Sequence, residues 1–265
     1  MPTLPVFNDS YRPSSNWVEA LAQKRAALKQ LEPFPSEIET IINRHLLAEF
    51  VMHDLALEGL QIDRERILSL IDKNFLETEL SQSDLLAKNL LNCFDHLHKI
   101  VESYEPKEKF SLSSELLQQL HALLMEGIGD GGGFWRKKDA QPLVEWHQPA
   151  YHEALPKLIE NALGWFAADS FTELHPVEQA WLVHLRLLDL QPFETECKRL
   201  VRLVSNIYTI RAGLGPVVVS FQEREYYDFA VSNAFQMITQ PGVELFARSI
   251  TRLTDELLAI ASKSE

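Results

Sequence analysis

Residues 191–202 read QPFETECKRLVR and lead into the most apolar helical pattern of the chain, expected from Glu196 to Ala212. A helix that is hydrophobic on almost every side is buried in the core. Yet Lys198, Arg199 and Arg202 lie in its first turns. Because the positive end of the helix dipole favours anions, basic residues there indicate an anion site, with phosphate as its usual occupant. The alternative is that both arginines form ion pairs with acidic side chains of the same chain.

Outward from this stretch, helical periodicity dominates the chain. Apolar residues recur at spacings of three and four, which predicts an all-α fold forming one compact domain with an N-terminal arm. The expected helices are 15–31, 36–57, 63–73, 83–102, 113–126, 153–169, 176–188, 196–212, 223–237 and 243–261. A capping signature begins at Ser36. Residues 127–133 hold half of the 10 glycines, so a loop or short hairpin is expected from there to about Pro149.

The composition is that of an acidic globular protein. The 265 residues are 46% hydrophobic and 24% charged, and the formal net charge of −13 disfavours binding to nucleic acid or anionic membranes. Cys93 and Cys197 alone provide neither a disulfide framework nor a zinc site. The start of the chain does not resemble a secretory signal, and no apolar run is long enough to cross a bilayer. We therefore expect a cytoplasmic protein with no metal site and no nucleic-acid or membrane partner.

The stretch 191–202 resembles the signature of the Fic/Doc (Fido) family, H-P-F-x-[D/E]-G-N-[G/K]-R-x-x-R. The positions that agree with it are Pro192, Phe193, Lys198, Arg199 and Arg202. Flanking similarity extends over about 111–229. It includes Gly133-Phe134-Trp135-Arg136, which resembles the family's target-docking flap; the flap is taken below as residues 134–146.

This resemblance implies a helical bundle with a short flap hairpin or loop. It implies an N-terminal arm and helix at 1–35, a Fic-type domain at 36–245 with an inhibitory-like helix near 41–59, and a C-terminal helix end at 246–265. Family members mostly transfer AMP from ATP to a protein hydroxyl, and the Doc branch transfers phosphate. The implied nucleotide or phosphate ligands are Lys198, Arg199 and Arg202.

The positions that differ from the signature are those that the resemblance assigns to the reaction itself. Gln191 stands at the position of the motif histidine, and an amide cannot act as the general base, whose help is typically worth about 10²–10⁴ in rate. Thr195 replaces the acidic residue that carries magnesium and offers no carboxylate. Glu196 replaces a glycine beside the phosphates, where its charge opposes another anion, and Cys197 replaces an asparagine. Together these changes predict that the usual transferase activity is lost.

A second resemblance concerns residues 54–59, DLALEG. They are similar to the family's inhibitory motif [S/T]-x-x-x-E-[G/N], with Asp54 in the Ser/Thr place. The resemblance implies that Glu58 pairs with Arg202 and blocks productive binding of the ATP γ-phosphate. The residues alone say only that Gly59 ends a helix whose last turn contains Glu58.

Three hypotheses follow. The first is a Fic-fold pseudoenzyme that binds a protein partner through the flap and retains residual nucleotide or phosphate binding, with no certain cofactor. The second is an atypical nucleotidyl- or phosphoryl-transferase that uses ATP with magnesium and a displaced base such as His184, which is otherwise a core histidine. A lowered thiol pKa at Cys197 would suggest a nucleophile. The third is a helical module whose pocket is filled by side chains.

Overall fold

The computed structural model describes residues 15–76, 80–104 and 109–262. The expected N-terminal arm, residues 1–13, lies outside these ranges. Every regular element within them is helical, as the periodicity predicted. The helices are α1 (Ser15–Gln30), α2 (Ser36–Leu57), α3 (Arg64–Ile71), α4 (Gln82–Glu102), α5 (Ser114–Leu124), η2 (His152–Ala154), α6 (Leu155–Phe166), α7 (Asp169–Thr172), α8 (Pro176–Leu190), α9 (Cys197–Arg211), η3 (Phe221–Glu223), α10 (Arg224–Ala234) and α11 (Gln240–Ala261).

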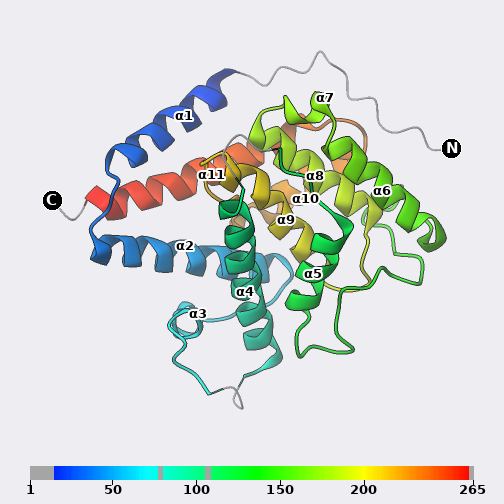
Figure 1. The fold of residues 1–265 in the computed structure, drawn as a ribbon, viewed down its shortest axis with the longest axis horizontal. Helices are drawn as coiled ribbons and strands as arrows, with labels where there is room; N and C mark the ends of the chain where they lie inside the picture. The colour runs from blue at the N-terminus through cyan, green and yellow to red at the C-terminus, as the bar shows by residue number, and fades with distance from the viewer. Residues whose placement is uncertain (1–14, 77–79, 105–108, 263–265) are drawn as a thin grey trace.

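Helix α9 is the centre of the bundle. It packs against α8, α4 and α5 (Figure 1). Eleven successive residues, Arg199 to Thr209, are buried, including Leu200 and Val204. A helix buried on all sides fixes its first turn relative to every neighbour. The start of α9 is therefore a rigid platform at the surface of the bundle.

The long C-terminal helix α11 runs between α1 and α2 (Figure 1). At its beginning, Gly242 lies so close to Trp181 of α8 that a Cβ atom would come within 1.9 Å of the indole ring. Only glycine permits this approach. Helix α11 thus packs on α8 and on α2, the two helices that lead into the functional region.

The sequence predictions and the structure differ in a few elements. The expected helix 153–169 is shorter and is flanked by η2 and α7, because Ala167 and Ala168 break the pattern with turns. Ser36 does not form the expected cap: α2 has Pro35 as its N-cap residue, with no side-chain cap bond. The region 127–150 is a loop without strands. None of the described helices is both long and apolar enough to cross a bilayer.

Candidate functional site

The loop that joins α8 to α9 carries the signature stretch. Helix α8 ends at Leu190, and the loop begins with Gln191 and ends with Glu196. Both of these residues have left-handed backbones, with φ of 44° and 51°. This conformation favours glycine, which accounts for the glycine that the signature expects at 196. Glu196 adopts the same turn at an energetic cost and adds a carboxylate at the helix start.

That carboxylate folds back onto the helix and forms an ion pair with Nη1 of Arg199. A second carboxylate, Asp54 of α2, receives hydrogen bonds from Nε of Arg199 at 2.7 Å and from Nε of Arg202 at 2.6 Å. Nη1 of Arg202 also donates to Glu58 at 2.8 Å. The Glu58–Arg202 pair implied by the resemblance is present. Both arginines are thus paired with carboxylates of the same chain, the alternative that the sequence left open.

The electrostatics of this cluster favour the charged forms. Burial opposes ionisation of Glu58, but the charge and hydrogen bond of Arg202 outweigh it and hold the pKa of this carboxyl below its usual range. Burial also acts to lower the pKa of Arg202, but the charges of Asp54, Tyr227 and Glu58, together with the hydrogen bond to Asp54, outweigh it and raise the pKa. The ion pairs therefore persist across the physiological pH range.

The cluster has no surplus positive charge. Lys198 is exposed and forms no ion pair with any described residue. With Lys198 included, three cations stand beside three carboxylates, so the formal charges sum to zero. A site that binds a multiply charged phosphate needs positive charge that is available to the ligand. This cluster provides little beyond Lys198.

An open cleft of about 760 Å³ lies in front of the helix start. It is bordered by the end of α2, the start of α4, the flap and the loop before α9. Arg199 lines it and Arg202 does not. Its walls also include Leu60, Leu86, Leu143 and Phe193 and the polar side chains of Gln82, Ser83, Gln141 and Gln191. The pocket is therefore not filled by side chains, contrary to the third hypothesis.

At the signature positions of the general base and the magnesium ligand, Gln191 and Thr195 form hydrogen bonds within the protein. The amide nitrogen of Gln191 donates to the carbonyl oxygen of Gln141 in the flap at 3.1 Å. The hydroxyl of Thr195 donates to Sδ of Met125 at 3.7 Å, and Thr195 does not line the cleft. Neither side chain offers a base or an anionic oxygen to a ligand.

The residues present do not fit the magnesium ion that the fold family uses. No carboxylate stands at position 195, and the neighbouring Glu196 is engaged by Arg199. Within the described ranges, no three His, Cys, Asp or Glu side chains converge as metal ligands. Magnesium needs oxygen ligands in near-octahedral geometry, and this cleft does not present them.

Arg136 of the flap is a buried structural residue. Its backbone N–H donates to the carbonyl of Pro192 at 2.9 Å. Its guanidinium donates to four further backbone carbonyls, those of Lys138 (2.8 Å), Ala150 (2.5 Å), Leu190 (3.3 Å) and Gln191 (2.7 Å). The planar fork of arginine suits such convergent acceptors. Arg136 therefore ties the flap to the signature loop rather than facing a partner.

The aromatic residues of the flap divide between the core and the surface. Trp135 packs against Phe193 with ring centroids 5.0 Å apart. Phe134 is 73% exposed, and Trp146 is also exposed. Phe134 and Trp146, rather than Trp135 and Arg136, are thus available to another molecule.

His121 of α5 is a residue of the site that the sequence analysis did not identify. Its ring stacks on Phe193 with centroids 3.9 Å apart. Nε2 lies 3.0 Å from the carbonyl oxygen of Thr195, and Nδ1 accepts from the backbone N–H of Gly133 at 2.9 Å. Gly132 packs so close that a Cβ would lie 2.5 Å from the His121 carbonyl. In the sequence, the only sign of this close packing is the run of glycines at 131–133.

Two candidate reactive groups lie in unsuitable surroundings. His184 is fully buried and hydrogen-bonds through Nε2 to the hydroxyl of Tyr227 at 2.9 Å. Burial, together with the charge of Arg202, lowers the pKa of His184 to about 3. Burial raises the pKa of the Cys197 thiol to about 11. His184 does not line the cleft, and Cys197 is a neutral thiol near pH 7.

Comparisons with known proteins place the family match over the helices that carry the site. The model described as Fic/DOC family matches residues 111–209. The chain is 27% identical over 214 residues to the protein adenylyltransferase Fic of Nematostella vectensis, covering 80% of this chain and 48% of that relative. The chain thus spans about half the length of this curated relative.

The likeness to solved structures concerns the fold. A Fic-domain-containing signaling protein from Bacteroides thetaiotaomicron superposes with a TM-score of 0.79 at 18% identity, covering 92% of this chain and 97% of that one. IbpAFic2, solved covalently tethered to Cdc42, superposes with a TM-score of 0.52 at 15% identity, covering 92% and 72% of the two chains.

Proposed function

Because this chain carries a Fic/DOC family segment at residues 111–209, we propose that it is a degenerate Fic protein that lacks AMP-transferase activity and acts by binding a protein partner. The Fic-type domain at 36–245 and a cytoplasmic location belong to the same proposal. The observation that carries it is the coordinated loss of chemistry around one loop. Gln191 bonds to the flap, Thr195 faces Met125, and Glu196 takes up Arg199.

The loss of free arginines weakens nucleotide binding. A hydrogen bond to a charged group contributes about 1.5–3 kcal/mol. If neither Arg199 nor Arg202 contacts phosphate, binding loses two such contacts, a factor of about 10²–10⁴. Residual nucleotide binding then depends on Lys198 and the cleft walls and is correspondingly weak. An atypical transferase would lack the same two phosphate contacts, so this alternative is disfavoured as well.

A displaced base does not rescue that alternative. His184 is buried away from the cleft and is held neutral by its low pKa. General-base catalysis requires hydrogen-bond reach to the substrate proton, directly or through one water. No histidine lines the cleft among the residues that the structure describes.

The surface next to the cleft supports the protein-binding part of the proposal. Phe134, Trp146 and Tyr151 are all exposed. Aromatic residues, above all Trp and Tyr, are the commonest anchors of protein interfaces. Arg136 and His121 fix the base of the flap, so this surface is ordered before a partner arrives. The fold neighbour IbpAFic2 was solved tethered to another protein, Cdc42, and we propose from the exposed aromatics that a protein partner of this chain binds at the flap.

Two assays on the wild-type chain test the proposal. Incubation with α-labelled ATP, magnesium and a cell lysate is expected to leave every protein unlabelled. Proteins retained by the wild type are expected to be lost with Phe134→Ser and Trp146→Ser, and kept with the matched change Phe229→Ser, an exposed aromatic of α10. Label transfer that disappears in Arg199→Ala would overturn the proposal.

A further inference from the structure

A cavity separate from the cleft lies in the corner where helices α2, α3 and α4 pack together (Figure 1). Its volume is about 1040 Å³, against about 760 Å³ for the cleft, and no residue lines both. We call it the corner groove. Its floor is apolar and includes Leu46, Leu47, Leu70, Ile71, Leu91 and Phe94. An apolar cavity with a few polar groups at its edge is typical of small-molecule sites.

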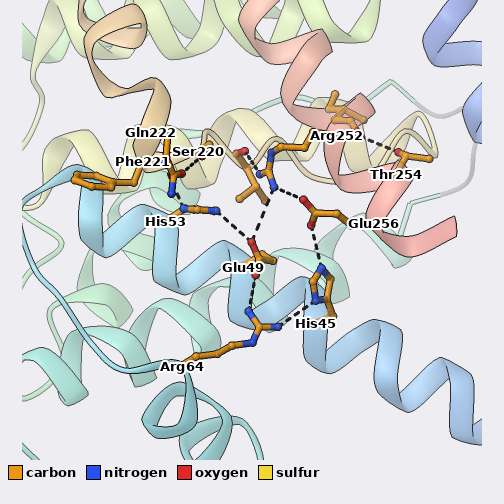
Figure 2. Close-up of polar contacts among 12 residues, drawn as sticks. His45, Glu49, His53, Arg64, Ser220, Phe221, Gln222, Arg252, Thr254 and Glu256 are labelled. Carbon is orange, nitrogen blue, oxygen red and sulfur yellow. Dashed lines mark hydrogen bonds and ion pairs between the residues drawn. The ribbon is translucent and has the colours of Figure 1, made fainter. Parts of the chain in front are cut away.

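Ion pairs at both ends of α3 fix the shape of the corner groove. At the start of α3, Arg64 donates to Glu49 of α2 at 2.5 Å, and Figure 2 shows this pair beside the contact between Arg64 and His45. At the end of α3, Asp72 accepts from Arg44 of α2 at 2.7 Å. The angle between α2 and α3 is thus set before a ligand arrives, which lowers the entropic cost of binding.

Lys73 lies at the rim of the corner groove, directly after the last turn of α3. Its backbone is left-handed, with φ of 56°, a conformation that favours glycine at a helix end. Its side chain is exposed and forms no ion pair or hydrogen bond with any described residue. The neighbouring Asp72 is already bonded to Arg44. Lys73 therefore offers a positive charge to a ligand in the groove, and the chain holds it there at an energetic cost.

The two ends of the corner groove differ in charge. At the end that holds Lys73 and Phe75, Nζ of Lys88 lies 5.9 Å from the centre of the Phe75 ring, within the range of a cation–π contact. Glu102 also lines the groove, and at 1.5 Å a residue it lies about 21 Å further along α4 than Lys88. One end therefore attracts an anion, and the other repels one. The remaining charged residues of the lining form an ion pair with each other, Asp95 with Lys99.

We infer that the corner groove is a binding site for a small amphipathic monoanion, a medium-chain carboxylate, whose chain lies on the apolar floor and whose carboxylate lies at Lys73. The floor removes the chain from water, which supplies most of the affinity. The unpaired ammonium of Lys73 selects a negatively charged head group. Glu102 disfavours a second carboxylate at the far end of the chain. The site is independent of the proposed function, which concerns the cleft and the flap.

Calorimetric titrations with octanoate, and with octanol as the uncharged molecule of the same chain length, test this assignment. The wild type is expected to bind octanoate at least about threefold more tightly than octanol. Lys73→Gln is expected to lose this preference and to bind octanol as the wild type does. The matched control Lys157→Gln, which changes an exposed lysine of α6, is expected to keep the preference. Equal binding of both probes by the wild type, an equal loss in the two variants, or no saturable binding of octanoate would overturn the inference.

A chain-length series on the wild type tests the apolar floor without any substitution. From hexanoate to octanoate to decanoate, the dissociation constant is expected to fall about two- to fourfold for each added methylene. Octanedioate is expected to bind more weakly than octanoate. Dissociation constants that do not change with chain length would contradict the inference. A dimer in light scattering that persists in octanoate and becomes monomeric in Leu47→Gln would also contradict it, because a second copy would then cover the groove.

Discussion

Replacement of Arg136 by methionine is expected to detach the flap from the signature loop. The guanidinium donates to four backbone carbonyls at 2.5–3.3 Å from a buried position. Hydrogen bonds from charged donors contribute about 1.5–3 kcal/mol each but do not add fully. Some of the freed carbonyls regain water once the flap moves, so we expect a loss of about 4 kcal/mol. For a chain of this size, that corresponds to a fall in melting temperature of about 8–16 °C.

Thermal unfolding followed by circular dichroism measures this effect, and trypsin cleavage after the exposed Lys137 reports on the flap itself. Arg136→Met is expected to be cut there faster than the wild type. The control is Lys138→Met, which introduces the same side chain at a position whose own side chain is 80% exposed and is expected to change stability by less than about 0.5 kcal/mol. If Arg136→Met melted within about 1 °C of the wild type with an unchanged cleavage rate, the clamp reasoning would be refuted.

Three further predictions follow from the site. Burial holds the pKa of His184 near 3, below the ordinary 6.5, so the unfolded chain binds more protons than the folded chain below pH 6.5. The free energy of unfolding should therefore fall by about 3 kcal/mol by pH 4.5. Chemical denaturation at a series of pH values should show a smaller fall for His184→Phe. With thiol pKa values raised to about 12 and 11, Cys93 and Cys197 should react at pH 8 at least about a hundredfold more slowly in the folded than in the unfolded chain; a fast-reacting thiol in a disulfide-exchange assay would contradict this. His121→Ala removes the stacked ring and two hydrogen bonds, so the free energy of unfolding should fall by about 2–4 kcal/mol. Trypsin should also cleave faster after Lys137. A urea-unfolding midpoint equal to that of the wild type would contradict this prediction.

The fold was largely accessible from the sequence because its signals are local. Amphipathic spacing located the helices to within a few residues, and the apolar run after Glu196 marked α9 as the buried centre. The signature stretch placed Arg199 and Arg202 at the start of that helix. The resemblance of residues 54–59 to the inhibitory motif implied Glu58 as a partner of Arg202, and the structure contains this pair.

The rest depends on contacts between residues far apart in the chain. In the sequence, Asp54 is recognisable only as a departure from the Ser/Thr of the inhibitory motif. The residues next to it do not predict that it bridges Arg199 and Arg202. Arg136 was identified only as part of the flap sequence, and its burial was not foreseeable, because its carbonyl acceptors come from three separate segments. For His121, no pattern of spacing predicts a stack on Phe193. Side-chain direction at a loop, such as Thr195 toward Met125, is set by tertiary packing.

The central claim is that this Fic-fold chain no longer holds a nucleotide for transfer. The measurement that tests it most directly is a calorimetric titration of ATP, with and without magnesium, into the wild type and into Glu58→Gly. Because Asp54 and Glu196 still engage both arginines when Glu58 is gone, neither protein is expected to bind magnesium-ATP with a dissociation constant below about 1 mM. Micromolar, magnesium-dependent binding by either protein would contradict the account.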